Sequence, residues 1–514
     1  MKCVLAYDIG GTSLRAGLFS LNGDFLGMTS AILPSLQMNA SGSSEADPQQ
    51  WWKSFCEATA ALFERPEAAG AEVTGLALSG LTRTQIFLDR EGKVVRQAMT
   101  WADARATVQA DRIIQAQTRM GSPGKTFGPV NAFHTLARIL WVKEREPERF
   151  EQVSTVLEPK DYLNFLLTGE RAGDNLSLSR VMSVSKNSLA YDLLKEIGLP
   201  KEIFPGLRNP WDQLGPVRVG LEPPMDRLAG VPVFVGAMDA WCGALGIAAV
   251  RAGRAFNASG TSEVFGVATQ TYGEVAGLVT QPWGKSLFLI GGPSQAGADC
   301  LAWYLEAFEG EARALKPGQV LKDLQTLKRQ PEPILFLPYL RGERVPLWQP
   351  DARGLLVGLN RQHRRADFLW AILEGVAFSN RQVLVIAGQG SQEAVKEVRI
   401  TGGAAESDVW CQTKADVLNL PLVRTQGKEA ALRGAAMVAL VGLGEYADTA
   451  ECQERLVRLD RVFEPRKERA RFYDRLFQRW VEAQKALLPL TESLTQDVRE
   501  GFGAEIKTTG RKDG

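Results

Sequence analysis

The fold of this 514-residue chain is decided by the stretch Asp8-Ile9-Gly10-Gly11-Thr12-Ser13-Leu14-Arg15. Residues 3–8 form an apolar run typical of a buried strand, and residues 14–20 predict a second strand. Asn22-Gly23 is a tight-turn signal, so residues 24–32 are expected to continue as a third strand. The chain therefore opens with antiparallel strands, and a glycine-rich turn joins the first two.

This turn gathers residue types that can bind phosphate. Its glycines let the backbone approach a ligand closely, and the turn amides with the hydroxyls of Thr12 and Ser13 can cradle phosphate oxygens. Arg15 can neutralise charge by a forked contact, and Asp8 can hold Mg²⁺ directly or through water. The alternative is an ordinary glycine-rich hairpin capped by Asp8.

The same pattern recurs in the middle of the chain. Gly260-Thr261-Ser262 lies between the predicted strands 254–258 and 264–268. The two copies are about 250 residues apart, which is compatible with a duplicated two-domain architecture. Together they suggest two hairpins that face one triphosphate from two domains.

The length of the chain also favours two large domains. We predict an N-terminal domain over residues 1–249 and a C-terminal domain over 250–490. The composition becomes polar and glycine-rich after Pro489, so residues 491–514 are expected to form a flexible tail.

The composition excludes several classes of protein. The net charge is +1, which gives no overall basic excess for nucleic acid or an anionic membrane. His134 and His363 are the only histidines, too few for Ser-His-Asp hydrolysis or a histidine-rich metal site. The six cysteines form no Cys-x-x-Cys pair. No signal peptide or membrane helix is recognisable, so we expect a cytoplasmic protein.

Two further motifs lie where predicted strands end. Asp239 follows the strand 231–236 and precedes a small-residue helix, so it is either a catalytic acid or a helix N-cap. Thr401-Gly402-Gly403 follows the strand 398–400, and its glycines either admit a flat ring or form a plain turn. The run 121–126 looks like a P-loop but lacks the required first glycine.

These residues, in this order, resemble the FGGY family of carbohydrate kinases, within the superfamily of actin-like, hexokinase-like ATPases. The resemblance covers roughly residues 3–445 and includes the following further segments: Leu140-Trp141-Val142-Lys143-Glu144, Asp161-Tyr162-Leu163, Leu167-Thr168-Gly169-Glu170, 336–344, 350–354, 373–377 and Trp410-Cys411-Gln412.

The resemblance implies an α/β fold with two actin-like (ribonuclease H-like) domains, each a mixed five-stranded sheet flanked by helices, with a cleft between them. It implies that Asp239 is the catalytic base and that Asp8 and Asp239 hold Mg²⁺. It also implies that ATP meets a set of loop residues: Gly11, Thr12, Ser13, Arg15, Gly260, Thr261, Gly297, Gly402, Gly403 and Ser407.

The substrate region departs from the known branches of the family. In Ser79-Gly80-Leu81-Thr82-Arg83-Thr84-Gln85, Arg83 matches an arginine of glycerol kinases, while the histidine of xylulokinases is absent. We hypothesise that Arg83 and Asp103 bracket vicinal hydroxyls and that Trp101 packs against the substrate. Alternatively, Arg83 is a surface charge and Trp101 belongs to the core. The resemblance favours a ketopentose such as xylulose, with a polyol like erythritol or glycerol, or gluconate, as alternatives.

Two rival functions remain open. One is a different enzyme of the same superfamily, either a pure ATPase or a glycosyl-acceptor hydrolase, and the other is a non-catalytic sugar-binding protein on the same fold. Asp8, Asp239 and Thr261 together favour the kinase. The expected partners are ATP, Mg²⁺ and a small sugar or polyol, with no nucleic acid and no membrane; a homodimer stays open.

Overall fold

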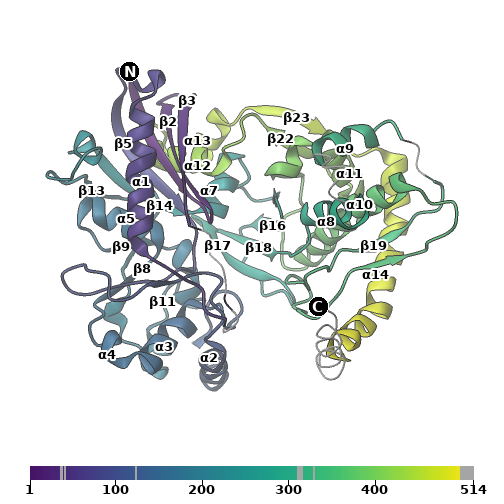
Figure 1. The fold of residues 1–514 in the computed structure, drawn as a ribbon, viewed down its shortest axis with the longest axis horizontal. Coiled ribbons are helices and arrows are strands. Elements are labelled where there is room, and N and C mark those ends of the chain that lie inside the picture. The colour runs from purple at the N-terminus through teal and green to yellow at the C-terminus, as the bar shows by residue number, and fades with distance from the viewer. Residues whose placement is uncertain (35–38, 40–41, 122–123, 310–316, 328–329, 498–514) are drawn as a thin grey trace, which may run out of the picture. The chain divides into compact units, whose positions relative to one another are not determined.

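A computed structural model describes residues 1–34, 39, 42–121, 124–309, 317–327 and 330–497 (Figure 1). They form two compact units. The first unit comprises Met1–Val250, Gln281–Ser286 and Glu429–Arg458, and the second comprises Arg251–Thr280, Leu287–Lys428 and the residues from Leu459 on. The first break follows Val250, close to the predicted boundary, but the first unit also takes two later segments that the prediction had placed in the second domain.

The elements of the first unit come mainly from the first half of the chain. Its strands are β1 (Lys2–Ile9), β2 (Ser13–Ser20), β3 (Phe25–Ile32), β4 (Glu45–Ala46), β5 (Glu72–Gly80), β6 (Ile86–Leu88), β7 (Ala98–Met99), β8 (Thr155–Leu157), β9 (Ala172–Asp174), β10 (Met182–Ser183), β11 (Ser188–Leu189), β12 (Gly206–Arg208), β13 (Gln213–Pro216) and β14 (Pro232–Met238). Its helices are α1 (Pro48–Phe63), α2 (Thr107–Met120), α3 (Thr135–Arg145), α4 (Pro147–Phe150), α5 (Pro159–Thr168), α6 (Tyr191–Glu196), α7 (Asp239–Gly246), α12 (Ala430–Gly442) and α13 (Thr449–Leu456).

The second unit holds the remaining elements, and β17 straddles the division. Its strands are β15 (Arg254–Ser259), β16 (Glu263–Thr269), β17 (Val279–Gly284), β18 (Leu287–Pro293), β19 (Leu335–Leu337), β20 (Leu355–Val357), β21 (Glu397–Thr401), β22 (Leu422–Thr425) and β23 (Leu459–Phe463). Its helices are α8 (Asp299–Glu309), α9 (Pro317–Leu324), α10 (Arg365–Ala387), α11 (Asp408–Leu418) and α14 (Lys467–Asp497).

The main sheets of the two units repeat one topology. The first has the order β13-β14-β5-β1-β2-β3 and the second β17-β18-β16-β15-β21-β22-β23. In each, a central strand pairs antiparallel with the strand that follows it and parallel with a later one: β1 with β2 and β5, and β15 with β16 and β21. The predicted α/β fold with a duplicated sheet is confirmed. The five shared strands are extended to six by β13 and to seven by β17 and β23.

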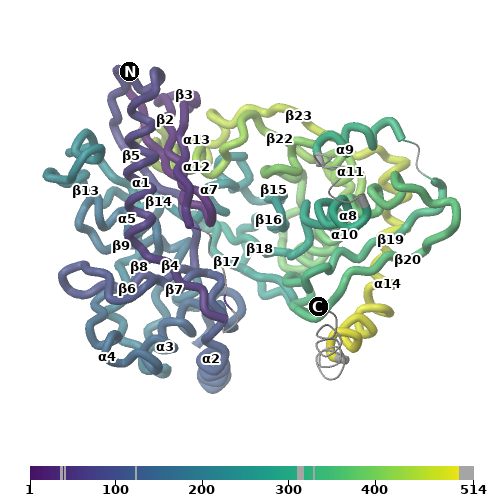
Figure 2. The backbone as a smooth tube through the Cα atoms, viewed as in Figure 1, coloured from purple at the N-terminus to yellow at the C-terminus, as the bar shows by residue number. Residues whose placement is uncertain are grey.

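Helices cover both faces of the sheet in the first unit. On one face, Tyr7 of β1 stacks on Phe55 of α1 with ring centroids 4.1 Å apart, and its hydroxyl lies 2.8 Å from that of Thr59. On the other face lies α12, which contacts β1, β5 and β14. Figure 2 shows this yellow-green segment beside the purple N-terminal strands. Because both faces are covered, β1 is buried almost throughout, as its apolar run predicts.

The expected tail begins later than the sequence suggests. Residues 491–497 continue α14, which passes through Pro489 without ending. Thr491 is buried, and Thr495 donates a hydrogen bond to the carbonyl of Asp351 at 3.1 Å. These contacts hold the polar end of the helix in place, so the prediction is wrong for 491–497. The rest of the predicted tail lies outside the described residues.

Helix α10 is long and apolar enough to cross a membrane by length and composition. However, 72% of its most apolar window is buried inside the protein. Apolar residues all around a helix are also typical of a helix at the centre of a large fold. We therefore describe α10 as a core helix of the second unit.

Helices α7 and α12 approach each other through two glycines. A Cβ atom on Gly246 would lie 1.9 Å from the carbonyl oxygen of Ala430, and one on Gly434 would lie 1.9 Å from that of Cys242. Neither contact can be relieved by rotating a side chain, since both partners are backbone. The contact places α7, and with it Asp239 at its first residue, against the rest of the unit.

This close approach makes a matched test of packing possible within α7. We expect Gly246→Ala to destabilise the protein by about 1–3 kcal/mol, because the added methyl forces the helices apart. Gly243→Ala in the same helix meets no atom within 4 Å, so it should be neutral or slightly stabilising. Urea unfolding of the two variants measures the difference. Equal stability of both variants would contradict the packing account.

Candidate active site

The first phosphate loop connects β1 and β2. Gly10 N–H donates to the carbonyl of Ser13 at 2.9 Å, and the carbonyl of Thr12 accepts from Leu33 N–H at 2.9 Å. These bonds close a tight hairpin whose tip, Gly11 and Thr12, is exposed. The loop therefore presents backbone and a hydroxyl to solvent, as a phosphate cradle requires.

Asp8 lies at the end of β1, opposite Arg15 on β2 and Ser79 on β5. The Ser79 hydroxyl donates to its carboxylate at 3.1 Å, and Arg15 lies 3.5 Å from it. Burial, and then the negative charge of Asp239, raise the pKa of Asp8 to about 7, although Arg15 and Ser79 oppose the shift. Arg15 also pairs with Glu429 at 3.2 Å. Asp8 is therefore only partly neutralised by its neighbours.

Asp239 is the first residue of α7 and directly follows β14. Its carboxylate accepts from Ala240 N–H at 2.7 Å, whereas the N-cap position belongs to Met238. The cap alternative therefore does not account for this carboxylate. Desolvation by surrounding atoms raises the pKa of Asp239 above its ordinary value, even though the residue keeps an exposed side, while Ala240 N–H and the charge of Arg83 lower it.

Arg83 is held in an unusual backbone conformation. Its φ is 58°, in the left-handed region that non-glycine residues rarely adopt, and such strain is typical of functional sites. Its N–H donates to Glu158 at 2.7 Å. Within the described residues its guanidinium has no hydrogen-bond or ion-pair partner, and it is electrostatically coupled to Asp239. It is therefore available to a ligand.

Arg138, which sequence reasoning missed, organises this region. Its fully buried guanidinium donates to the carbonyls of Asp103 at 3.0 Å and Trp101 at 2.9 Å, and also to that of Arg83. One side chain thus fixes the backbone of all three predicted substrate residues. No sequence spacing signals this role, because these contacts span 35 to 55 residues.

The predicted substrate residues Trp101 and Asp103 differ in exposure and in hydrogen bonding. Trp101 is 43% exposed and is free to pack against a ligand. Asp103 is fully buried, and its carboxylate accepts from Arg105 at 2.7 Å and from Ser44 N–H at 2.9 Å. These contacts give Asp103 a structural role in this structure. Binding of a substrate hydroxyl by Asp103 stays a prediction.

The second predicted phosphate loop joins β15 to β16 by a turn one residue shorter than the first. Gly260 N–H donates to Ser262 O at 3.1 Å, and the carbonyls of Gly260 and Thr261 accept from Ala298 at 2.9 Å and from Asp299 at 3.2 Å. A Cβ on Gly297 would lie 2.5 Å from Thr261 O. The loop is thus packed directly against Gly297 and the start of α8.

The predicted adenosine-lining residues follow β21. Gly402 has φ 93°, and a Cβ there would lie 2.5 Å from Ser259 O, whereas Gly403 faces open space. Ser407 is the N-cap of α11, where its hydroxyl accepts from Trp410 N–H at 3.3 Å. The glycines therefore bring the second loop and the start of α11 together. The predicted meeting of the two phosphate loops on one triphosphate stays a prediction.

A buried lysine stabilises the second loop from beneath. Lys414 is fully buried and donates to Asn257 at 2.7 Å and to Ser259 at 3.2 Å, and it pairs with Glu263 at 2.8 Å. These three partners belong to the two strands that flank Gly260, and Lys414 also donates to Asn380 of α10 at 2.9 Å. Sequence reasoning missed this network, since an isolated Lys in a helix gives no signal of burial.

The candidate metal ligands at this site are the two carboxylates Asp8 and Asp239. No group of three His, Cys, Asp or Glu side chains could hold a metal ion in the part of the chain that the structure describes. Asp8 and Asp239 are close enough that the charge of one raises the pKa of the other. Two carboxylates fit Mg²⁺ completed by water and phosphate oxygens, which is its usual coordination.

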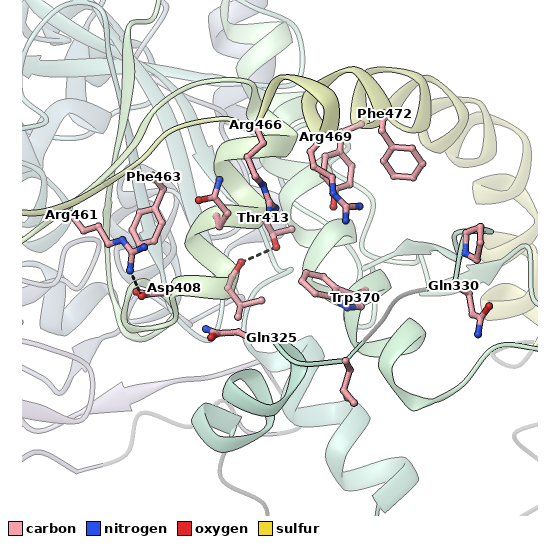
Figure 3. Close-up of a pocket in the computed structure, with 15 residues that line it drawn as sticks. Gln325, Gln330, Trp370, Asp408, Thr413, Arg461, Phe463, Arg466, Arg469 and Phe472 are labelled. Atoms are coloured by element: carbon pink, nitrogen blue, oxygen red, sulfur yellow. Dashed lines mark hydrogen bonds and ion pairs between the residues drawn. The ribbon is translucent and has the colours of Figure 1, made fainter.

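A separate cavity of about 780 Å³ lies in the second unit (Figure 3). Figure 3 shows Trp370, Asp408, Arg466 and Phe472 along its wall. None of the predicted site residues lines it. It is therefore distinct from the candidate site.

The ionisation of Asp8 predicts a pH-dependent stability. A carboxyl whose pKa is about 7 in the folded protein and near 4 when unfolded destabilises the fold as pH rises through this window. Asp8→Asn should therefore raise the melting temperature by several degrees at pH 8, without Mg²⁺, and by much less at pH 5. Thermal melts at the two pH values measure this. An equal shift at both values would contradict it.

Comparisons with known proteins identify the family of the chain. Residues 3–246 match the N-terminal domain of the FGGY family of carbohydrate kinases, and residues 255–443 match its C-terminal domain. The chain is 29% identical to a xylulose kinase of Bacillus subtilis over 484 residues, covering 93% of this chain and 95% of the relative. It is 25% identical to a gluconokinase of Bacillus licheniformis over 497 residues, covering 94% and 96%. The crystal structure of xylulose kinase from Rhodospirillum rubrum matches with a TM-score of 0.85 at 25% identity, covering 95% of this chain and 99% of that one.

Proposed function

Since the chain belongs to the FGGY family of carbohydrate kinases and is an ATP-dependent sugar kinase, we propose that Asp239 accepts the proton of the substrate hydroxyl as the phosphoryl group arrives. The observation that carries this is the position of Asp239 at the start of α7, coupled to both Asp8 and the unpaired Arg83. A base, a second carboxylate and a guanidinium thus gather in one place.

The chemistry follows from charge and position. Phosphoryl transfer requires mainly positioning and neutralisation of charge. Asp239 orients the hydroxyl and takes its proton late, because a carboxylate is a weak base toward an alcohol. Its raised pKa makes it a stronger base than a free aspartate. Arg83 binds an oxygen of the sugar, and Trp101 packs against its carbon chain.

The phosphate groups are assigned to the two loops. Gly11, Thr12, Ser13 and Arg15 would contact ATP phosphates from the first loop, and Gly260 and Thr261 from the second. Gly297, Gly402, Gly403 and Ser407 would line the adenosine site. Asp8 and Asp239 would hold Mg²⁺, which supplies positive charge to the phosphates when bound.

The choice of sugar to test comes from the relatives. The xylulose kinases among the relatives make a ketopentose such as xylulose the first substrate to test, and a gluconokinase and a glycerol kinase make an acid and a polyol the alternatives. An ADP-release screen over ketopentoses, polyols and aldonates tests the function. Release that ignores every acceptor would contradict it.

The base assignment predicts a selective loss of turnover. Asp239→Asn should lower kcat by about 10²–10⁴-fold, because the amide cannot accept the proton, while ATP still binds. The matched control is Asp226→Asn, an exposed acid of the same unit. Steady-state kinetics with the best acceptor measure both variants. A kcat for Asp239→Asn within a few-fold of the unmodified enzyme would rule out the base role.

The role of Arg83 predicts a different signature. Arg83→Ala should raise the KM for the sugar by about 10–100-fold, the loss expected for a charged hydrogen bond, and leave the KM for ATP largely unchanged. Kinetics with each substrate varied in turn separate the two. An unchanged sugar KM would refute substrate binding by Arg83.

A further inference from the structure

Four basic side chains gather around the predicted substrate residues: Arg83, His134, Arg138 and Arg180, called here the basic cluster. The guanidinium of Arg138 donates to the carbonyl of Arg83. His134 lies one helical turn before Arg138, whose N–H donates to its carbonyl at 3.2 Å. The charge of Arg83 acts on all three of the others. The cluster is therefore one electrostatic unit.

The positive charge of this cluster is opposed only at a distance, by Asp103 and Glu158 at Arg138 and by Asp239 and Glu158 at Arg83. Among the described residues, neither Arg83, Arg138 nor Arg180 forms an ion pair. The carboxylate of Asp103 is engaged by Arg105. Glu158 accepts the N–H of Arg83, but burial raises the pKa of Glu158 well above its usual range and so favours its neutral form. Asp239 is the carboxylate with an exposed side that acts on Arg83 among the residues that the structure describes.

The pKa values of Arg138, Arg180 and His134 are all lowered in this cluster. Burial, and then the charge of Arg83, lower the pKa of Arg138 and of Arg180 to about 9. Burial and the neighbouring arginines lower the pKa of His134 to about 3, so it is neutral. Unpaired charges in a desolvated site cost several kcal/mol unless a counter-charge arrives. A bound anion would supply that counter-charge directly.

The members of the cluster differ in how free they are to bind a ligand. Arg138 is committed to its three carbonyls. Arg180 makes only long contacts, from Nη1 to the carbonyls of Phe127 at 3.4 Å and Pro129 at 3.5 Å. The guanidinium of Arg83 has no partner within the described residues. Arg83 and Arg180 are therefore the two that can receive an anion.

We propose that the acceptor is an anionic carbohydrate, a polyhydroxy carboxylic acid, whose carboxylate is held by Arg83 and Arg180 while one of its hydroxyls meets Asp239. This rests on the proposed kinase function and narrows its substrate. A carboxylate forms paired, charge-assisted hydrogen bonds with guanidinium groups. A neutral ketose or polyol would desolvate the same arginines without neutralising them, so it should bind more weakly.

Pairs of acceptors that differ only at one end of the chain test this directly. ADP release is measured with glycerate and glycerol, threonate and threitol, xylonate and xylitol, and gluconate and glucitol, with xylulose as a neutral ketose. We expect at least one acid to exceed its alcohol and xylulose in kcat/KM by 10-fold or more. A neutral compound that equals or exceeds the best acid would overturn the proposal while leaving the kinase function intact.

A different result would show that the proposed kinase function is wrong. If no compound releases ADP, the proposed reaction is wrong, and binding calorimetry of the same pairs decides the inference by itself. Acids that bind at least 10-fold more tightly than their alcohols would support the anion site. Equal or weaker binding of the acids would overturn it.

Variants show whether the cluster carries the preference. Arg180→Gln should raise the KM for the acid by about 10–100-fold and that for the neutral partner by less than about threefold. The control is Arg149→Gln, an exposed arginine of the same unit with a 58% exposed side chain, which should change neither. Added NaCl should raise the KM for the acid alone, because salt screens charge. Equal changes for acid and alcohol would contradict the assignment, and thermal melts verify that each variant is folded.

Discussion

The candidate site depends on the electrostatic conflict between two carboxylates, Asp8 and Asp239. Three paired strands, β1, β2 and β5, hold Asp8 in place, and the contact between α7 and α12 holds Asp239. Burial, and then the negative charge of Asp239, raise the pKa of Asp8. A cation bound near both carboxylates would relieve this repulsion, because an opposite charge favours the ionised form of each. The conflict is thus the physical reason to place phosphoryl transfer here.

Both units support their loops with buried charge. Lys414 bonds to the strands around Gly260 in the second unit. In the first unit, Lys160 pairs with Asp174 at 2.8 Å and packs beside Gly80, on the strand next to the one that Asp239 follows. Buried pairs contribute little net stability but are costly to break. Such networks keep loop geometry defined where glycines and short hairpins would otherwise leave it loose.

Much of this fold could be predicted from the sequence because its signals are local. A short run of residues predicts each of three elements: the Asp8–Arg15 hairpin, its counterpart at Gly260 and the strand that ends before Asp239. The role of Arg138 and the burial of Asp103 could not be predicted, because they arise from contacts between segments far apart in the chain. Residues 491–497 were misassigned for the same reason: polar side chains suggested a tail, while distant contacts at Asp351 and Arg353 hold the helix.

We propose above all that Asp239 meets the hydroxyl that is phosphorylated. A crystal structure of the protein with ADP, Mg²⁺ and its best acceptor measures this most directly. The account predicts an oxygen of Asp239 within about 2.6–3.2 Å of one acceptor hydroxyl, the reach of a general base. A bound acceptor whose hydroxyls all lie well beyond that reach, with another side chain in contact instead, would contradict it.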